Sequence, residues 1–135
     1  MHSLIFPYKL ISRRYIPVIP IILYGSLKTK IRTEAFVDSG ATFSIFSIDV
    51  AKSLMLDLKD AREQFFVVGD GSFIPAKVIK IPVEIGNEKI KADIAFSEKL
   101  NIGFNLLGRK GIFEHFDEIA FNEKRKEVIF RLKTT

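Results

Sequence analysis

The sequence has no cysteine and only two histidines among its 135 residues. The absence of cysteine excludes a disulfide scaffold, a thiolate zinc site and a cysteine nucleophile. Two histidines, His2 and His115, leave little from which to build a metal centre of another kind. We therefore expect no metal site and no cofactor.

The sequence also lacks an apolar run long enough to cross a membrane. Its most apolar stretch, from Tyr15 to Gly25, follows two arginines and superficially resembles the start of a signal peptide. Pro17 and Pro20 would break a helix there, and a bilayer span needs about 20 apolar residues. We interpret the stretch as a strand, and we expect a cytoplasmic protein without a membrane partner.

The positive charge is scattered. The formal net charge is +5, which raises the hypothesis of nucleic-acid binding. The densest basic cluster, residues 124–126, is bracketed by Glu123 and Glu127, and no stacking aromatics are interleaved with the basic residues. A solvated hairpin turn is the better interpretation of this cluster. A nucleic-acid-binding domain therefore remains only the third hypothesis for the function, and no nucleic-acid partner is expected.

The length and the periodicity predict one mainly β domain over residues 1–135. Segments rich in β-branched and aromatic residues predict strands at 16–24, 30–37, 64–68, 73–83, 89–96 and 128–132. Ser47 is a plausible N-cap for one short helix, and a second short helix is predicted over 110–116. The strands at 16–37 and 81–95 form a weak internal repeat, each copy a hairpin running into an apolar pair and a glycine.

The tripeptide Asp38-Ser39-Gly40 ends one predicted strand. A carboxylate at the mouth of an apolar strand needs hydrogen-bond donors, and the Gly40 amide and the Ser39 hydroxyl are the obvious ones. Asp, Ser and Gly are also common residues of ordinary turns. The tripeptide gains weight only from two further motifs along the chain.

Three ordered segments resemble the motifs of the retropepsin-type aspartic proteases. Residues 35–42 (AFVDSGAT) are similar to the catalytic loop, residues 69–74 (GDGSFI) to the glycine-rich flap, and residues 105–109 (NLLGR) to the motif that leads into a short helix. The resemblance covers about residues 16–132. It implies a closed, mainly β barrel, an obligate C2 homodimer, a polypeptide substrate and peptide-bond hydrolysis by two aspartates, one from each subunit.

The resemblance also implies roles for particular residues. Asp38 is the catalytic residue, Ser39 the cross-dimer grip and Gly40 a contact for carboxylate and substrate; these three, with Ala41 and Thr42, form the loop. The flap tip is Gly69, Asp70, Gly71 and Ser72, the substrate pocket holds Phe36, Phe73 and Leu106, and Gly108 and Arg109 are structural. A plain hairpin turn and ordinary core residues remain alternatives for the flap and the pocket.

The chemistry of amide hydrolysis agrees with a dimer. One ionised carboxylate activates water while a protonated neighbour polarises the carbonyl, which requires two carboxylates about 3 Å apart. The second repeat has Leu106 and Leu107 where the first has Asp38, so the partner carboxylate must come across a twofold axis. The alternative is an inactive binding or scaffolding domain of the same fold.

Two features lie outside this pattern. The family commonly pairs the motif arginine with an acid at the position of Thr42, so Arg109 is expected to bond backbone carbonyls near Thr42, its hydroxyl, or a carboxylate of either subunit. The apolar extension within residues 1–14 has no counterpart in the three motifs. It is expected to pack at or beside the dimer interface, or to be a disordered tail.

Overall fold

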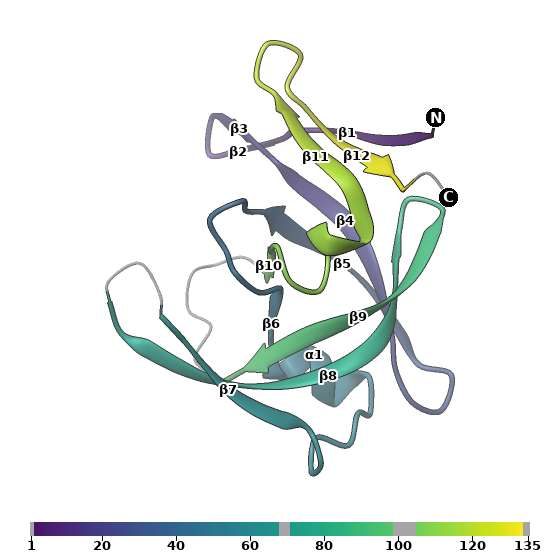
Figure 1. Ribbon diagram of the computed structural model, residues 1–135, viewed down its shortest axis with the longest axis vertical. Coiled ribbons are helices and arrows are strands. Elements are labelled where there is room, and N and C mark those ends of the chain that lie inside the picture. The colour runs from purple at the N-terminus through teal and green to yellow at the C-terminus, as the bar shows by residue number, and fades with distance from the viewer. Residues whose placement is uncertain (1, 68–70, 99–104, 134–135) are drawn as a thin grey trace.

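Strands dominate the fold (Figure 1). The computed structural model describes residues 2–67, 71–98 and 105–133. In chain order the elements are β1 (Ser3–Pro7), β2 (Lys9–Ile11), β3 (Arg14–Ile16), β4 (Val18–Tyr24), β5 (Lys30–Val37), β6 (Ile45–Ser47), α1 (Ile48–Ser53), β7 (Arg62–Val67), β8 (Phe73–Ile85), β9 (Glu88–Ser97), β10 (Asn105–Leu107), the 3-10 turn η1 (Phe113–His115), β11 (Phe116–Asn122) and β12 (Glu127–Leu132).

The largest sheet closes on itself. Its strands run in the order β4-β5-β10-β6-β9-β8-β7, and a further pairing of β4 with β8 joins the ends of the ring and leaves β7 outside it. Ile22 and Leu23 of β4 pair there with Glu84 and Val83 of β8. The prediction of a closed, mainly β barrel is therefore confirmed.

The long strand β8, 13 residues in length, contributes to two apolar clusters: buried positions alternate in each half, and the alternation shifts by one residue between Val78 and Ile81. Its second half, with Ile81, Val83 and Ile85, belongs to the main core inside the ring. In its first half, Ile74 and its neighbours pack with residues of β7 and of the segment after Asp38 in a smaller cluster, which comprises Phe43, Ile45, Phe66, Ile74, Ala76, Val78 and Ala95. The β7–β8 hairpin is thus an extension of the barrel wall.

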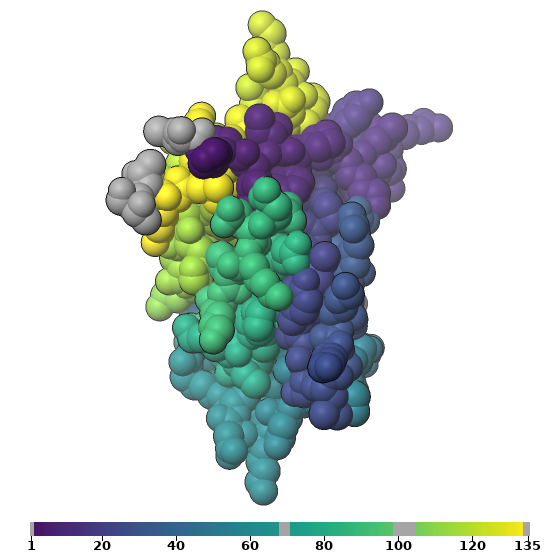
Figure 2. Space-filling model, turned by 90° about the vertical axis from the view of Figure 1, so that its right-hand side faces the viewer, coloured from purple at the N-terminus to yellow at the C-terminus, as the bar shows by residue number. Residues whose placement is uncertain are grey.

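The terminal strands form a separate sheet in the order β1-β12-β11. Figure 2 shows β1 lying across the end of the β8–β9 hairpin, where Leu4 lies against Gly86. Leu4 pairs with Phe130, and Phe6 with Val128. Residues 3–7 are therefore a paired strand, and the alternative of a disordered tail is wrong for this part of the extension.

Tyr8 fixes the chain where β1 leads into β2. Its side chain is 6% exposed, its amide donates to the Lys126 carbonyl at 2.7 Å, and its hydroxyl donates to the Glu123 carboxylate. Burial, together with the hydrogen bond and the negative charge of Glu123, raises the pKa of Tyr8 to about 12.

Tyr8→Phe is expected to lower the free energy of unfolding by about 1 kcal/mol at neutral pH, because the hydrogen bond is lost. The folded pKa lies above the unfolded value of 10.0, so the contribution is present below pH 10 and is lost as pH rises through the folded value. Urea titrations at several pH values check this. A variant whose deficit stayed constant through that alkaline range would contradict it.

The structure corrects the predicted second helix and confirms the predicted turn at the basic cluster. The second helix predicted over 110–116 is wrong in extent: only Phe113–His115 form a 3-10 turn, and Phe116 already begins β11, where its ring packs edge-on against Phe130. The basic cluster at 124–126 lies in the β11–β12 turn, as expected. No helix within the described residues is long and apolar enough to span a bilayer.

Candidate active site

Asp38 lies directly after β5, in a tight turn held by its own backbone and side chain. Its amide donates to the Leu107 carbonyl at 2.9 Å, and its carbonyl accepts from the Ala41 amide at 3.1 Å. Its Oδ1 accepts from the Gly40 amide at 2.9 Å. A Cβ on Gly40 would lie 3.2 Å from the same oxygen, so glycine leaves this side of the carboxylate open.

The turn rests on the segment after β10. Strands β5 and β10 run parallel, with Leu106 opposite Phe36 and Leu107 opposite Val37. The two apolar pairs of the internal repeat therefore lie side by side. Beyond them, the Arg109 amide donates to the Ala41 carbonyl at 3.0 Å, and the Lys110 amide to the Thr42 carbonyl at 2.8 Å.

Gly108 permits this close approach of two backbones. A Cβ at this position would lie 2.3 Å from the Phe43 carbonyl oxygen and 2.6 Å from that of Ala41. Both are backbone atoms and cannot rotate away. Only glycine therefore fits at position 108 without moving the Ala41 or Phe43 backbone.

Gly108→Ala is expected to lower the free energy of unfolding by at least about 2 kcal/mol, because the Asp38 loop must shift to make room. Gly71→Ala is the control: Gly71 has φ +84° but nothing within 4 Å of its Cβ position, so only the backbone cost of about 1 kcal/mol applies. Chemical denaturation measures both. Equal losses for the two variants would contradict the contact argument.

Ser44 is a buried hydroxyl that the sequence does not reveal. It is completely buried, and its Oγ accepts from the Gly108 amide at 2.9 Å and donates to the Lys110 carbonyl at 3.0 Å. Its carbonyl accepts from the Ala95 amide at 2.9 Å. A serine within the run FSIFS carries no local signal of this role, which depends entirely on distant partners.

A cleft of about 530 Å³ opens beside Asp38. Of the residues expected at the site, Asp38, Gly40, Ala41, Thr42 and Leu106 line it. Residues that the sequence did not single out complete its walls: Phe43, Ile45, Phe65, Phe66 and Val67. The cleft therefore combines one carboxylate with mostly apolar walls.

The β7–β8 hairpin forms one of these walls. Phe66 on β7 packs against Phe43, with ring centroids 4.6 Å apart. Ile74, directly opposite Phe66, shares this inner face. Phe73 pairs with Val67, one position away on the hairpin, and is 67% exposed.

Several expected site residues are placed differently. Phe36 and Phe73 are not among the residues that line the cleft. Of the four residues expected at a flap tip, Gly71 and Ser72 are exposed just before β8, whereas Gly69 and Asp70 lie outside the described residues. Instead of Phe36 and Phe73, the aromatic residues that line the cleft are Phe43 and, from β7, Phe65 and Phe66.

Arg109 and Ser39 are both exposed. Within the described part of the chain, the Arg109 guanidinium has no acceptor and the Ser39 hydroxyl has no partner. The expected support of the Asp38 loop by the Arg109 side chain is thus not found among the described residues. The Arg109 main-chain amide, bonded to Ala41, supports the loop instead.

Comparisons with known proteins identify the fold. No protein-family model matches the sequence, and no curated protein matches it. The structure is similar to the crystal structure of a retropepsin-like aspartic protease from Rickettsia conorii, with a TM-score of 0.67 and 20% identity over 96% of this chain and 99% of that one. The chain therefore has the retropepsin-like fold, as its three motifs predicted.

Proposed function

We propose that the protein is an aspartic endopeptidase that hydrolyses peptide bonds as a homodimer. The observation that carries the proposal is the position of Asp38: its carboxylate, oriented by the Gly40 amide at 2.9 Å, borders an apolar cleft of about 530 Å³ on a retropepsin-like fold. The inactive scaffolding alternative would have the same fold, and the intact Asp38-Ser39-Gly40 loop favours the catalytic function over it.

In the proposed mechanism, the Asp38 carboxylates of two subunits share one proton. The ionised member accepts a proton from water, and the oxygen of that water forms a bond to the scissile carbonyl carbon. The protonated member donates a hydrogen bond to the carbonyl oxygen. Collapse of the tetrahedral intermediate breaks the C–N bond after a carboxyl proton moves to the leaving nitrogen, so no other reactant is needed.

The walls of the cleft define the substrate class. Phe43, Phe65, Phe66 and Leu106 offer apolar surface in the cleft that Asp38 borders, and an extended polypeptide with large apolar side chains would bury this surface. The flap hairpin would cover the bound chain and exclude water. Ser39 and Arg109, which are exposed in one chain, would find their partners in the second subunit.

The experiment is cleavage of an unfolded protein by the wild type and by Asp38→Asn, each with and without a statine-type transition-state mimic. Cleavage that the mimic blocks and the variant lacks supports the proposal. A correctly folded wild type that cleaves nothing, yet binds unfolded polypeptide, would favour the scaffolding alternative.

A further inference from the structure

The β2–β3 hairpin packs as an arm rather than as part of the barrel. Within the described residues its strands form a sheet of their own, with Lys9 opposite Ile16, Leu10 opposite Tyr15 and Ile11 opposite Arg14. Leu10 and Tyr15 are directly paired and therefore share one face. They are 56% and 55% exposed, so more than half of each residue is open to solvent in the described structure.

An isolated two-stranded hairpin is marginally stable in water, and the turn of this one is unfavourable. Ser12 and Arg13 have φ of 50° and 67°, a left-handed conformation in which glycine or asparagine is usual. Arg13 and Arg14 are exposed, and neither has an acidic partner among the described residues. Among the described residues, the two arginines therefore have no charged partner, and the Leu10–Tyr15 face is largely open to solvent.

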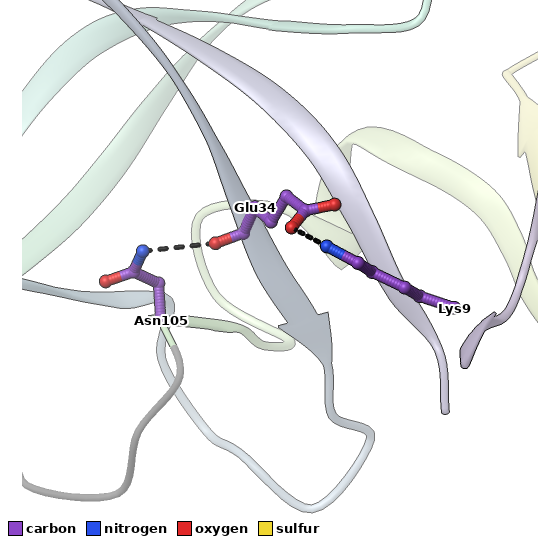
Figure 3. Close-up of polar contacts among 3 residues, drawn as sticks. All are labelled: Lys9, Glu34 and Asn105. Carbon is purple, nitrogen blue, oxygen red and sulfur yellow. Dashed lines mark hydrogen bonds and ion pairs between the residues drawn. The ribbon is translucent and has the colours of Figure 1, made fainter. Parts of the chain in front are cut away.

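The arm is joined to the strand that carries Asp38. The Pro17 carbonyl, one residue after β3, accepts from the Val37 amide at 2.8 Å. Figure 3 shows Lys9 ion-paired with Glu34 of β5, and Asn105 Nδ2 donating to the Glu34 carbonyl at 3.1 Å. Strand β5 thus holds the base of the arm, Asn105 of β10 bonds to β5 at the same residue, Glu34, and both strands lead into the candidate site.

The arm lies on the side of the molecule where a second subunit must approach. In Figure 1 the β2–β3 hairpin, the loop after β5 and the β7–β8 hairpin all project to the left, whereas both termini lie at the right. A dyad requires the two Asp38 carboxylates about 3 Å apart. The ends of the two β5 strands must then lie close together, and the arm attached to each must be near the other chain.

We propose that residues 9–16 form a dimerisation arm that packs its Leu10–Tyr15 face on a second copy of this chain. The inference rests on the proposed homodimeric function and adds the element that holds the two copies together. The second copy would bury the apolar pair and supply carboxylates for the two arginines at the tip. The isologous contact occurs twice in the dimer because of the twofold symmetry.

The first test compares two double variants by sedimentation over a dilution series. Leu10→Ser with Tyr15→Ser is expected to raise the dimer dissociation constant by about tenfold or more. Leu27→Ser with Met55→Ser is the control, because these side chains are 78% and 54% exposed on segments away from the arm; it should leave the constant unchanged. Far-UV circular dichroism checks that both variants fold.

A second measurement uses the absence of cysteine. A spin label on Ser12→Cys, at the exposed tip of the arm, should lose mobility as the protein concentration rises through the dissociation constant. A label on Leu27→Cys should stay mobile throughout. This readout leaves Leu10 and Tyr15 in place.

The possible results separate this inference from the proposed function. If the arm variant dimerises like the wild type, or both double variants weaken the dimer equally, the arm is not the interface, even if Asp38→Asn is inactive. A wild type that stays monomeric at every concentration also overturns it. A weakened dimer whose cleavage activity returns at high protein concentration supports both; a weakened dimer without cleavage in the wild type supports the arm alone.

Discussion

Asp38→Asn is expected to lower the rate of peptide-bond hydrolysis by a factor of about 10³ or more, since general acid–base catalysis contributes on this scale. The asparagine carbonyl oxygen can still accept the Gly40 amide, which donates to Asp38 Oδ1 at 2.9 Å in the native loop. The loop geometry and the cleft are therefore retained. What is lost is the group that accepts a proton from water.

The matched control is Asp117→Asn, which removes one negative charge at an exposed position of β11. Its rate should equal that of the wild type. Initial rates on a fluorogenic unfolded protein, with thermal unfolding of each variant measured alongside, distinguish chemistry from stability. Full activity in Asp38→Asn would refute the assignment of the catalytic residue.

The fold was predictable where strands are long and bounded by turns. The predictions for 30–37 and 89–96 agree with β5 and β9 to within one residue at either end. The short strands β6 and β10 were not predicted, because three residues are too few to show a periodicity. The β2–β3 hairpin was not predicted either. Its turn residues Ser12 and Arg13 have positive φ, but neither is the glycine or asparagine that usually marks such a turn in a sequence.

The misplaced second helix has a non-local cause. Residues 110–116 have a helical apolar pattern, but Phe116 pairs with Leu132 of β12 and packs on the buried Phe130 ring. Pairing with the next strand across the β11–β12 turn, together with the packing of Phe116 on Phe130, outweighs a weak local preference. The helix shrinks to a single 3-10 turn ahead of β11.

Some residues of the candidate site could be predicted from local motifs, and others could not. Asp38, Gly40 and Gly108 could be singled out because their motifs are local and their spacing is specific. Ser44, Phe43 and Phe66 could not, since each acts through partners distant in sequence: Gly108 for Ser44, and the ring contact between Phe43 and Phe66. Local motifs identify the reacting group, whereas the walls that surround it are set by the closed sheet.

Dilution should abolish activity if each chain supplies half of the dyad. Well below the dissociation constant, each tenfold dilution is expected to lower the rate per chain about tenfold, because the dimer fraction then falls in proportion to concentration. Activity assays and sedimentation on the same dilution series, in an inert carrier protein, should give one common midpoint. A constant rate per chain across the monomer range would contradict the shared site.

Subunit mixing tests the same point without dilution. When wild type is re-equilibrated with a ninefold excess of Asp38→Asn, random pairing leaves about a tenth of the wild-type chains in dimers with two aspartates. Activity should fall to about that fraction, because a dimer with one Asp38 lacks the partner that shares its proton. The same excess of a chain that carries Asp38→Asn together with Leu10→Ser and Tyr15→Ser should inhibit far less, since the arm variant pairs poorly. Inhibition by the first mixture alone would link the dyad to the arm, whereas inhibition by neither would show that one chain works without the other.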